Sequence, residues 1–286
     1  MIPLQDLISW RTHAPWPNDD QVEQDYLLSQ SVAAIFQDRF LSQHVAMRGG
    51  TVLHKAHLAP AVRYSEDIDL VLVTDRQESH IRKALHRVLE PILGAPQESV
   101  AGYIKLAVRN AVGKSKILRS TYSYEPTQST LAAKATLKVE TNVSERASCY
   151  PMVPVEFKYP DDNGVLTTCT VKSFDIDEML GTKMRALLQR EQGRDLFDLF
   201  WAWSLSKDGK TPYAVQPERV AHAFGHYMAA EGSRFTGEQF IEQLRLRVAK
   251  PKFREDVKSM LSSSFGEYDV DHACEEVCDV FLSKLR

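Results

Sequence analysis

Cysteine is scarce in this chain, and the four that occur form no Cys-x-x-Cys pair. Neither a disulfide framework nor a zinc site is expected, and Cys274 and Cys278, four residues apart, are predicted to be buried thiols on one helix face. No apolar run approaches the roughly 18 residues of a membrane-spanning helix. The N-terminus also lacks a basic segment followed by an apolar core. We therefore expect no membrane contact and a cytoplasmic location.

The chain also lacks an excess of charge of either sign. Its 35 Lys and Arg residues stand against 38 Asp and Glu residues, a formal net charge of −3. Any contact with nucleic acid must therefore depend on a local basic patch. With 286 residues, 43% of them hydrophobic, the chain is long enough for one large globular domain or two lobes.

What the chain does have is a concentrated motif between residues 48 and 73. Asp67 and Asp69 are separated by one residue and precede the apolar run Leu70 to Val73, which predicts a buried strand. Residues i and i+2 share a strand face, so both carboxylates should point the same way. Two like charges held this close repel each other unless a cation lies between them. Oxygen ligands without a nearby Cys or His favour Mg²⁺.

The same motif opens with glycines. Gly49 and Gly50 allow the backbone to approach a ligand closely, and Thr51 adds a hydroxyl where a helix over residues 51 to 58 could begin. A glycine turn that leads into a helix N-terminus can bind an anion. A phosphate-binding turn, a short helix and Asp-x-Asp on a strand follow each other in the order that a metal-dependent nucleotidyl transfer site needs.

Gly49-Gly50-Thr51 followed by Arg63 to Leu70 resembles the signature of the nucleotidyltransferase toxins of abortive-infection and type IV toxin-antitoxin systems, the AbiEii/AbiGii and MenT group. This group belongs to the DNA polymerase β-like nucleotidyltransferase superfamily. The resemblance covers roughly residues 45 to 203. It implies that Mg²⁺ is bound by Asp67, Asp69 and a third carboxylate. It further implies nucleotide-binding roles for Gly49, Gly50, Thr51, Ser65, Lys183, Arg190 and Arg194.

By this resemblance, Glu140 stands where the superfamily places its third carboxylate. Residues 134 to 143 alternate between apolar and polar side chains, with Lys138, Glu140 and Asn142 on one face of a predicted strand. In the catalytic interpretation, Glu140 binds the metal nearer the acceptor hydroxyl and helps to deprotonate it. In the alternative interpretation, Glu140 only pairs with a neighbouring cation such as Lys138.

Two predicted helices, residues 176 to 192 and from 194 onward, carry the remaining elements of the resemblance. Lys183 would bind the triphosphate as a point charge. Asp198 would be a further catalytic acid that orients Lys183 or Arg194, with Asp195 as the other candidate. The structural alternative is an i,i+4 pair of Arg194 and Asp198, with Asp195 interacting with the helix dipole.

Other charged segments are less specific. A predicted hairpin over residues 100 to 124, with its turn at Gly113 to Ser115, alternates basic and aromatic side chains, which suits RNA or a solvated sheet edge. A basic cluster at residues 245 to 254 could hold RNA, an acidic partner or only solvent. His222 and His226 have a metal-like spacing but no acidic helper, so packing or surface roles are favoured.

These observations predict a two-lobed α/β (α+β) protein. A polymerase β-like nucleotidyltransferase domain with a mixed sheet would span residues 1–172, and a C-terminal helical domain, residues 173–286, would close the cleft. The resemblance implies transfer of NMP from an NTP to the 3′ end of tRNA, which blocks translation and growth, and a cognate antitoxin partner. The alternatives are NMP or phosphate transfer to a protein such as the antitoxin, and a catalytically inactive binding protein.

Overall fold

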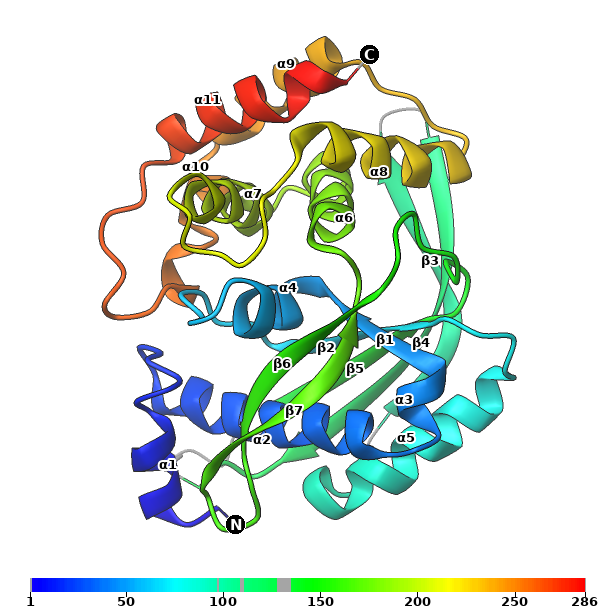
Figure 1. The fold of residues 1–286 in the computed structure, drawn as a ribbon, viewed down its shortest axis with the longest axis vertical. Coiled ribbons are helices and arrows are strands. Elements are labelled where there is room, and N and C mark those ends of the chain that lie inside the picture. Colours follow the sequence, from blue (N-terminus) through cyan, green and yellow to red (C-terminus); the bar gives the residue numbers. More distant parts are fainter. Residues whose placement is uncertain (1, 97, 109–110, 128–134, 286) are drawn as a thin grey trace.

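One mixed sheet of seven strands runs through the molecule in the order β3-β4-β5-β2-β1-β7-β6 (Figure 1). The computed structural model describes residues 2–96, 98–108, 111–127 and 135–285. The strands are β1 (Val45–Arg48), β2 (Asp67–Leu72), β3 (Glu98–Val108), β4 (Ala111–Tyr124), β5 (Ala135–Asn142), β6 (Val153–Pro160) and β7 (Leu166–Ser173). β2 is parallel to β5 and antiparallel to β1, which confirms the predicted mixed sheet.

Helices lie at both ends of the molecule in Figure 1, with α6 to α11 gathered at one end and α1, α2 and α5 at the other. The N-terminal helices are α1 (Leu4–Trp10), α2 (Asp19–Gln37), α3 (Leu41–His44), α4 (Gly49–Val52), the π-helix η1 (Leu53–His57) and α5 (Glu78–Leu93). The C-terminal helices are α6 (Ile176–Gln189), α7 (Gly193–Lys207), α8 (Pro217–Ala230), α9 (Gly237–Val248), α10 (Pro251–Glu255), η2 (Lys258–Met260), α11 (Val270–Val280) and η3 (Leu282–Lys284).

The two faces of the sheet differ in chemistry. Ile68 and Leu70 of β2 are buried in the core, where α2 contacts β2 and β5 and also α5. Val139 of β5 belongs to the same core. The alternation of side chains along a strand then sends Asp67 and Asp69 to the opposite face. Burial of the apolar face therefore determines which way both carboxylates point, as the pattern predicts.

Three predicted boundaries are wrong. The apolar spacing after Asp19 or Asp20 predicts a first long helix to about Gln43, but α2 ends at Gln37, where Asp38 is extended and its carboxylate accepts hydrogen bonds from the backbone N–H groups of Phe40 and Leu41. The helix predicted over residues 51 to 58 begins earlier, at Gly49, and continues as a π-helix. Gly113 pairs with Leu106 inside the β3–β4 ladder, so residues 113 to 115 are strand and not turn.

One hydrophobic core cluster extends from the sheet into the C-terminal helices. It joins Ile68 and Leu118 of the sheet to Leu187, Phe224 and Phe281. Cys274 and Cys278 are free, buried thiols of the same cluster, as predicted. The division at residues 172 and 173 falls at the end of β7, and the two-lobe organisation stays a prediction.

Candidate active site

The paired carboxylates of β2 face a third carboxylate on the neighbouring strand. Asp69 stands directly opposite Glu140 in the parallel ladder between β2 and β5. Glu140 also accepts a hydrogen bond from Arg119 Nε of β4, at 2.6 Å from Oε1. The three acids predicted from the motif are therefore brought to one place, but Arg119 and not Lys138 is the cation that pairs with Glu140.

The pKa values in this cluster respond to the crowding of negative charge. Burial, together with the adjacent Asp69 carboxylate, raises the pKa of Asp67 to about 6. Burial and the Glu140 carboxylate raise the pKa of Asp69. These shifts indicate that the ionised cluster needs positive charge that its own side chains do not fully provide.

Gly49 and Gly50 lie against this cluster because neither has a side chain. Gly49 has φ +87°, and a Cβ built on it would lie 2.0 Å from Asp69 Oδ2. A Cβ on Gly50 would lie 2.6 Å from Arg63 Nη2 and 3.0 Å from Ser65 Oγ. Gly49 thus brings backbone to the Asp69 carboxylate, and Gly50 brings backbone to Arg63 and Ser65. The Thr51 hydroxyl does not share this role, since it is buried and donates to the Asp67 carbonyl oxygen at 2.7 Å.

Lys183 of α6 reaches the same region and is held by two acids of α7. Its Nζ lies 2.7 Å from Asp198 Oδ2 and 3.4 Å from Asp195 Oδ1. Both acids are fully buried. Burial alone would raise the pKa of Asp198, but Arg63 and Lys183 hold it well below its usual range. Of the two predicted partners of Asp198, the structure shows Lys183 and not Arg194.

Arg63 and His54 complete the cluster and were assigned no role by the sequence. Arg63 donates to Asp198 through Nε at 2.8 Å and Nη2 at 3.0 Å. His54 Nε2 lies 2.8 Å from Asp198 Oδ1, and burial lowers the pKa of His54 to about 4, so the ring is neutral near pH 7. Arg63 lies inside the motif, but no spacing rule connects it to Asp198, which is 135 residues away.

The two predicted nucleotide-binding arginines are placed differently. Arg190 donates to both oxygens of Asp195, at 2.7 and 2.8 Å. Arg194 has weaker contacts within the chain, since its Nε is 4.0 Å from Asp256 Oδ2 and 3.2 Å from Gln192 Oε1. The i,i+4 pair of Arg194 with Asp198 is not formed, because Asp198 points at Lys183, Arg63 and His54. Of the two arginines, Arg194 is therefore the one without a close carboxylate partner for its guanidinium group.

Most of these groups line one cavity of about 360 Å³, which we call the carboxylate cavity, whereas Gly49, Thr51, His54, Asp195 and Asp198 do not line it. Its walls are formed by Gly50, Arg63, Tyr64, Ser65, Glu66, Asp67, Asp69, Ile117, Arg119, Glu140, Lys183, Arg190, Arg194 and Met260. Its acids and cations come from five elements and the 63–66 segment. That segment is fixed by a hydrogen bond from Tyr64 N to Met260 O and one from Ser262 N to Val62 O.

The other charged segments are explained largely by internal contacts. Arg247 of α9 donates to the carbonyl oxygens of Leu187, Leu188 and Arg190 and so caps the end of α6. In the same predicted cluster, Arg254 pairs with Asp271 and Lys250 with Glu191. In the predicted hairpin, residue 109 lies outside the described residues, and at residues 105 and 114 the structure describes the backbone strand but not the basic side chain.

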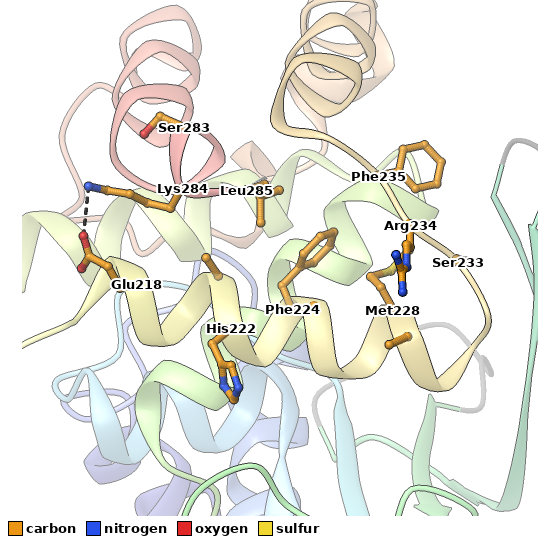
Figure 2. Close-up of a pocket in the computed structure, with 13 residues that line it drawn as sticks. Glu218, His222, Phe224, Met228, Ser233, Arg234, Phe235, Ser283, Lys284 and Leu285 are labelled. Carbon is orange, nitrogen blue, oxygen red and sulfur yellow. Dashed lines mark ion pairs between the residues drawn. The ribbon is translucent and has the colours of Figure 1, made fainter.

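A separate cavity of about 840 Å³ lies between α8 and the C-terminal residues (Figure 2). Phe224, Met228 and Phe235 contribute apolar surface, and Lys284 pairs with Glu218 at 3.0 Å. His222 lines this cavity and lies 3.1 Å from the Tyr150 hydroxyl, as a packing histidine would. The cavity shares no residue with the carboxylate cavity and lacks its paired acids.

Comparison with known proteins agrees with this geometry. The model of the family described as "Nucleotidyl transferase AbiEii toxin, Type IV TA system" matches residues 31–276. Among solved structures, MenT4, a nucleotidyltransferase toxin of Mycobacterium tuberculosis, has a TM-score of 0.60 at 15% identity, covering 98% of this chain and 90% of its own. JHP933 from Helicobacter pylori has a TM-score of 0.49 at 14% identity, covering 92% and 90%.

No curated protein matches the chain. No helix of the described residues is long and apolar enough to cross a membrane. The family match extends over most of the chain and includes every residue of the carboxylate cavity. The chain therefore belongs to the AbiEii family of nucleotidyltransferase toxins of type IV toxin-antitoxin systems.

Proposed function

We propose that this protein transfers a nucleoside monophosphate from an NTP to the 3′ end of a tRNA in a reaction that depends on Mg²⁺, and thereby blocks translation and growth. One observation carries the proposal: three carboxylates on the adjacent strands β2 and β5 and five cations from other parts of the chain line the same cavity. Carboxylates that bind a metal, opposed by cations that bind phosphates, are what phosphoryl-group chemistry requires.

The donor set suits Mg²⁺. Asp67, Asp69 and Glu140 offer only oxygen atoms, which hard cations prefer. Within the described residues, no three His, Cys, Asp or Glu side chains are placed so that they could hold a metal ion. Mg²⁺ usually takes one or two carboxylates together with substrate phosphates rather than an all-protein cage, so an incomplete set is what a nucleotide-dependent site should have. Asp67, Asp69 and Glu140 would hold the Mg²⁺, which would supply positive charge that neutralises the triphosphate.

The residues of the chain have separate tasks in this reaction. Lys183, Arg190 and Arg194 bind the triphosphate, and the backbone at Gly49 and Gly50 approaches it closely. The acceptor hydroxyl oxygen forms a bond to the α-phosphorus while the bond from that phosphorus to the bridging oxygen of pyrophosphate breaks. Glu140 accepts the proton that leaves the hydroxyl, through the oxygen that Arg119 does not engage.

Membership of a type IV toxin family supports an NTP as the donor and an antitoxin as the partner. The acceptor is the finer part of the proposal. A tRNA 3′ end presents a free hydroxyl on a flexible single strand, which can enter a cavity of this size. A protein hydroxyl, such as one of the antitoxin, is the rival acceptor that the same site could serve.

The test is incubation of the purified protein with total tRNA, Mg²⁺ and each α-labelled NTP in turn. We expect label on tRNA with at least one NTP, loss of label when EDTA removes the metal, and no label with Asp67→Asn/Asp69→Asn. Asp75→Asn is the matched control, because Asp75 follows the same strand but its side chain is fully exposed. That variant should label tRNA as the wild type does.

Each result has a distinct meaning. Label on protein in place of tRNA would show that the acceptor is a protein, and the assignment as a nucleotidyltransferase would stand. Periodate oxidation of the tRNA before the reaction blocks its 3′ end. If the oxidised tRNA is labelled as strongly as untreated tRNA, and the label lies at internal positions, the 3′-end assignment is refuted. No label on either macromolecule with any of the four nucleotides would refute nucleotidyl transfer.

A further inference from the structure

We propose that a second cavity, beneath α6, holds the nucleobase of the donor NTP and reads it through the side-chain amides of Asn142 and Gln189; this rests on the function proposed above. The cavity, which we call the amide cavity, measures about 200 Å³. It is lined by Arg48, Gly49, Asp69, Ile117, Asn142, Thr182, Lys183, Arg185, Ala186, Gln189 and Arg190.

The amide cavity adjoins the carboxylate cavity. Four residues line both: Asp69, Ile117, Lys183 and Arg190. Asn142 is two positions beyond Glu140 on β5, so both side chains lie on the same sheet face. Because the two cavities share these wall residues, a nucleotide whose phosphates lie beside Lys183 and Arg190 can place its base in the amide cavity under α6.

Its four cations, Arg48, Lys183, Arg185 and Arg190, are paired with carboxylates inside the protein. Arg48 pairs with Glu145 at 2.7 Å, and Arg185 pairs with Glu145 at 2.8 Å and with Glu231 at 2.9 Å. Arg194 of the carboxylate cavity, by comparison, has its nearest carboxylate oxygen at 4.0 Å. The amide cavity is thus suited to a neutral, hydrogen-bonding group flanked by apolar atoms of Ile117 and Ala186. A nucleobase has that chemistry and a phosphate does not.

Hydrogen bonds fix what each amide can present. Asn142 Oδ1 accepts from Ser144 N at 3.0 Å, Ser144 Oγ at 3.1 Å and Glu145 N at 2.9 Å. This orientation leaves the Asn142 NH₂ group as a donor. Among the described residues, no acceptor is paired with that NH₂ group. Asn142 therefore offers hydrogens to a ligand and no acceptor.

The side-chain amide of Gln189 is fixed so that it presents an acceptor to the cavity and not a donor. Its Nε2 donates to Glu231 Oε2 at 2.6 Å, which leaves Oε1 as an acceptor. The Thr182 hydroxyl donates to the Met179 carbonyl oxygen at 2.7 Å, so it too can only accept. The cavity hence combines a fixed donor with fixed acceptors. Base edges differ in the order of their donors and acceptors, which is the property that such a lining can distinguish.

The experiment replaces the hydrogen-bond donor of Asn142 without changing the shape of the side chain. Asn142→Asp keeps an oxygen for the three accepted hydrogen bonds and replaces the NH₂ donor with an acceptor. We would measure Kd for each of the four NTPs in Mg²⁺ without acceptor, and kcat/KM for each NTP at saturating acceptor. We expect affinity for the preferred NTP to fall at least tenfold, about the effect of one mispaired buried group, and the ranking of the four NTPs to change.

Two further variants sharpen the test. Gln189→Met removes the acceptor at similar volume and should reduce the preference among NTPs. Gln37→Glu, an exposed amide on α2 that lines neither cavity, should leave the ranking unchanged. Unfolding temperatures establish that each variant is folded.

If folded Asn142→Asp ranks the four NTPs as the wild type does, the assignment of the cavity to the nucleobase is wrong. If the NTP ranking is unchanged but the choice of acceptor changes, the cavity binds the acceptor and not the nucleobase. The binding measurement separates this failure from failure of the proposed function. A wild type that binds NTPs selectively but labels nothing refutes only the transfer. A wild type that binds no NTP refutes both.

Discussion

Asp198 Oδ2 lies 2.7 Å from Lys183 Nζ, and the same carboxylate receives two hydrogen bonds from Arg63. All three side chains are buried. One acid of α7 therefore holds two cations that come from separate parts of the chain, one on α6 and one in the segment before β2. The carboxylate supports both the fold and the position of the predicted phosphate-binding lysine.

The first prediction separates these two effects. Asp198→Asn leaves Lys183 and Arg63 buried without their full counter-charge, so we expect a loss of about 3–5 kcal/mol in the free energy of unfolding, with loss of nucleotide incorporation. Lys183→Met should also abolish incorporation but cost less than about 2 kcal/mol, because Arg63 still pairs with Asp198. Urea denaturation and α-labelled NTP incorporation measure the two effects. Equal destabilisation by both variants would contradict this account.

The second prediction concerns the approach of Gly49 to Asp69. Gly49→Ala places a methyl group where Asp69 Oδ2 now lies and also strains the backbone at φ +87°. Gly209→Ala is a matched control, since Gly209 has φ +65° but no atom within 4 Å of the new Cβ. Both variants should lose about 1 kcal/mol from backbone strain. Only Gly49→Ala should also lose incorporation by at least about tenfold, because it displaces Asp69, a carboxylate that we propose binds the metal.

The third prediction contrasts the two arginines that line the carboxylate cavity. Arg194→Met should raise KM for the NTP about tenfold with a change in unfolding free energy below about 0.5 kcal/mol, because no close carboxylate depends on it. Arg190→Met should raise KM as well but also destabilise the protein by roughly 1–3 kcal/mol, since buried Asp195 loses a bidentate partner. Denaturation curves together with initial rates at varied NTP distinguish the two. A stable Arg190→Met protein would show that Lys183 alone satisfies Asp195.

The fourth prediction concerns pH. Burial lowers the pKa of His57 to about 4, below the value of about 6.5 in an unfolded chain. The unfolded chain therefore takes up a proton first as pH falls, and stability present above about pH 6.5 is lost between 6.5 and 4. Between pH 7 and 5 this loss amounts to about 2 kcal/mol.

His57→Gln can keep a hydrogen bond to Ser173 and should remove this pH-dependent part. The exposed His226→Gln serves as its control. The measurement is the unfolding free energy of each variant relative to wild type at pH 7 and pH 5. A constant difference across that range for His57→Gln would contradict the prediction.

Local patterns predicted the parts of the site that lie close together in sequence. Alternation placed Asp67 and Asp69 on one face, and the resemblance added Glu140 and Lys183, which the fold brings to the same cavity. Contacts between segments that are far apart in the sequence leave no periodic pattern in that sequence. The partners of Asp198 are an example, because a bidentate contact over 135 residues depends on how α7 packs against the segment before β2. The π-helix was missed for a similar reason, since its sequence also satisfies an ordinary helix.

The cap that Arg247 places on the end of α6 has a consequence for genetics. Arg247 lies 57 residues beyond Arg190, past the last residue of the recognised motifs. The carbonyl groups it binds belong to the final turn of the helix that presents Lys183 and Arg190. A selection for inactive alleles should therefore recover missense changes at Arg247 and stop codons throughout α9, and an alignment of motifs alone would misjudge such alleles as intact.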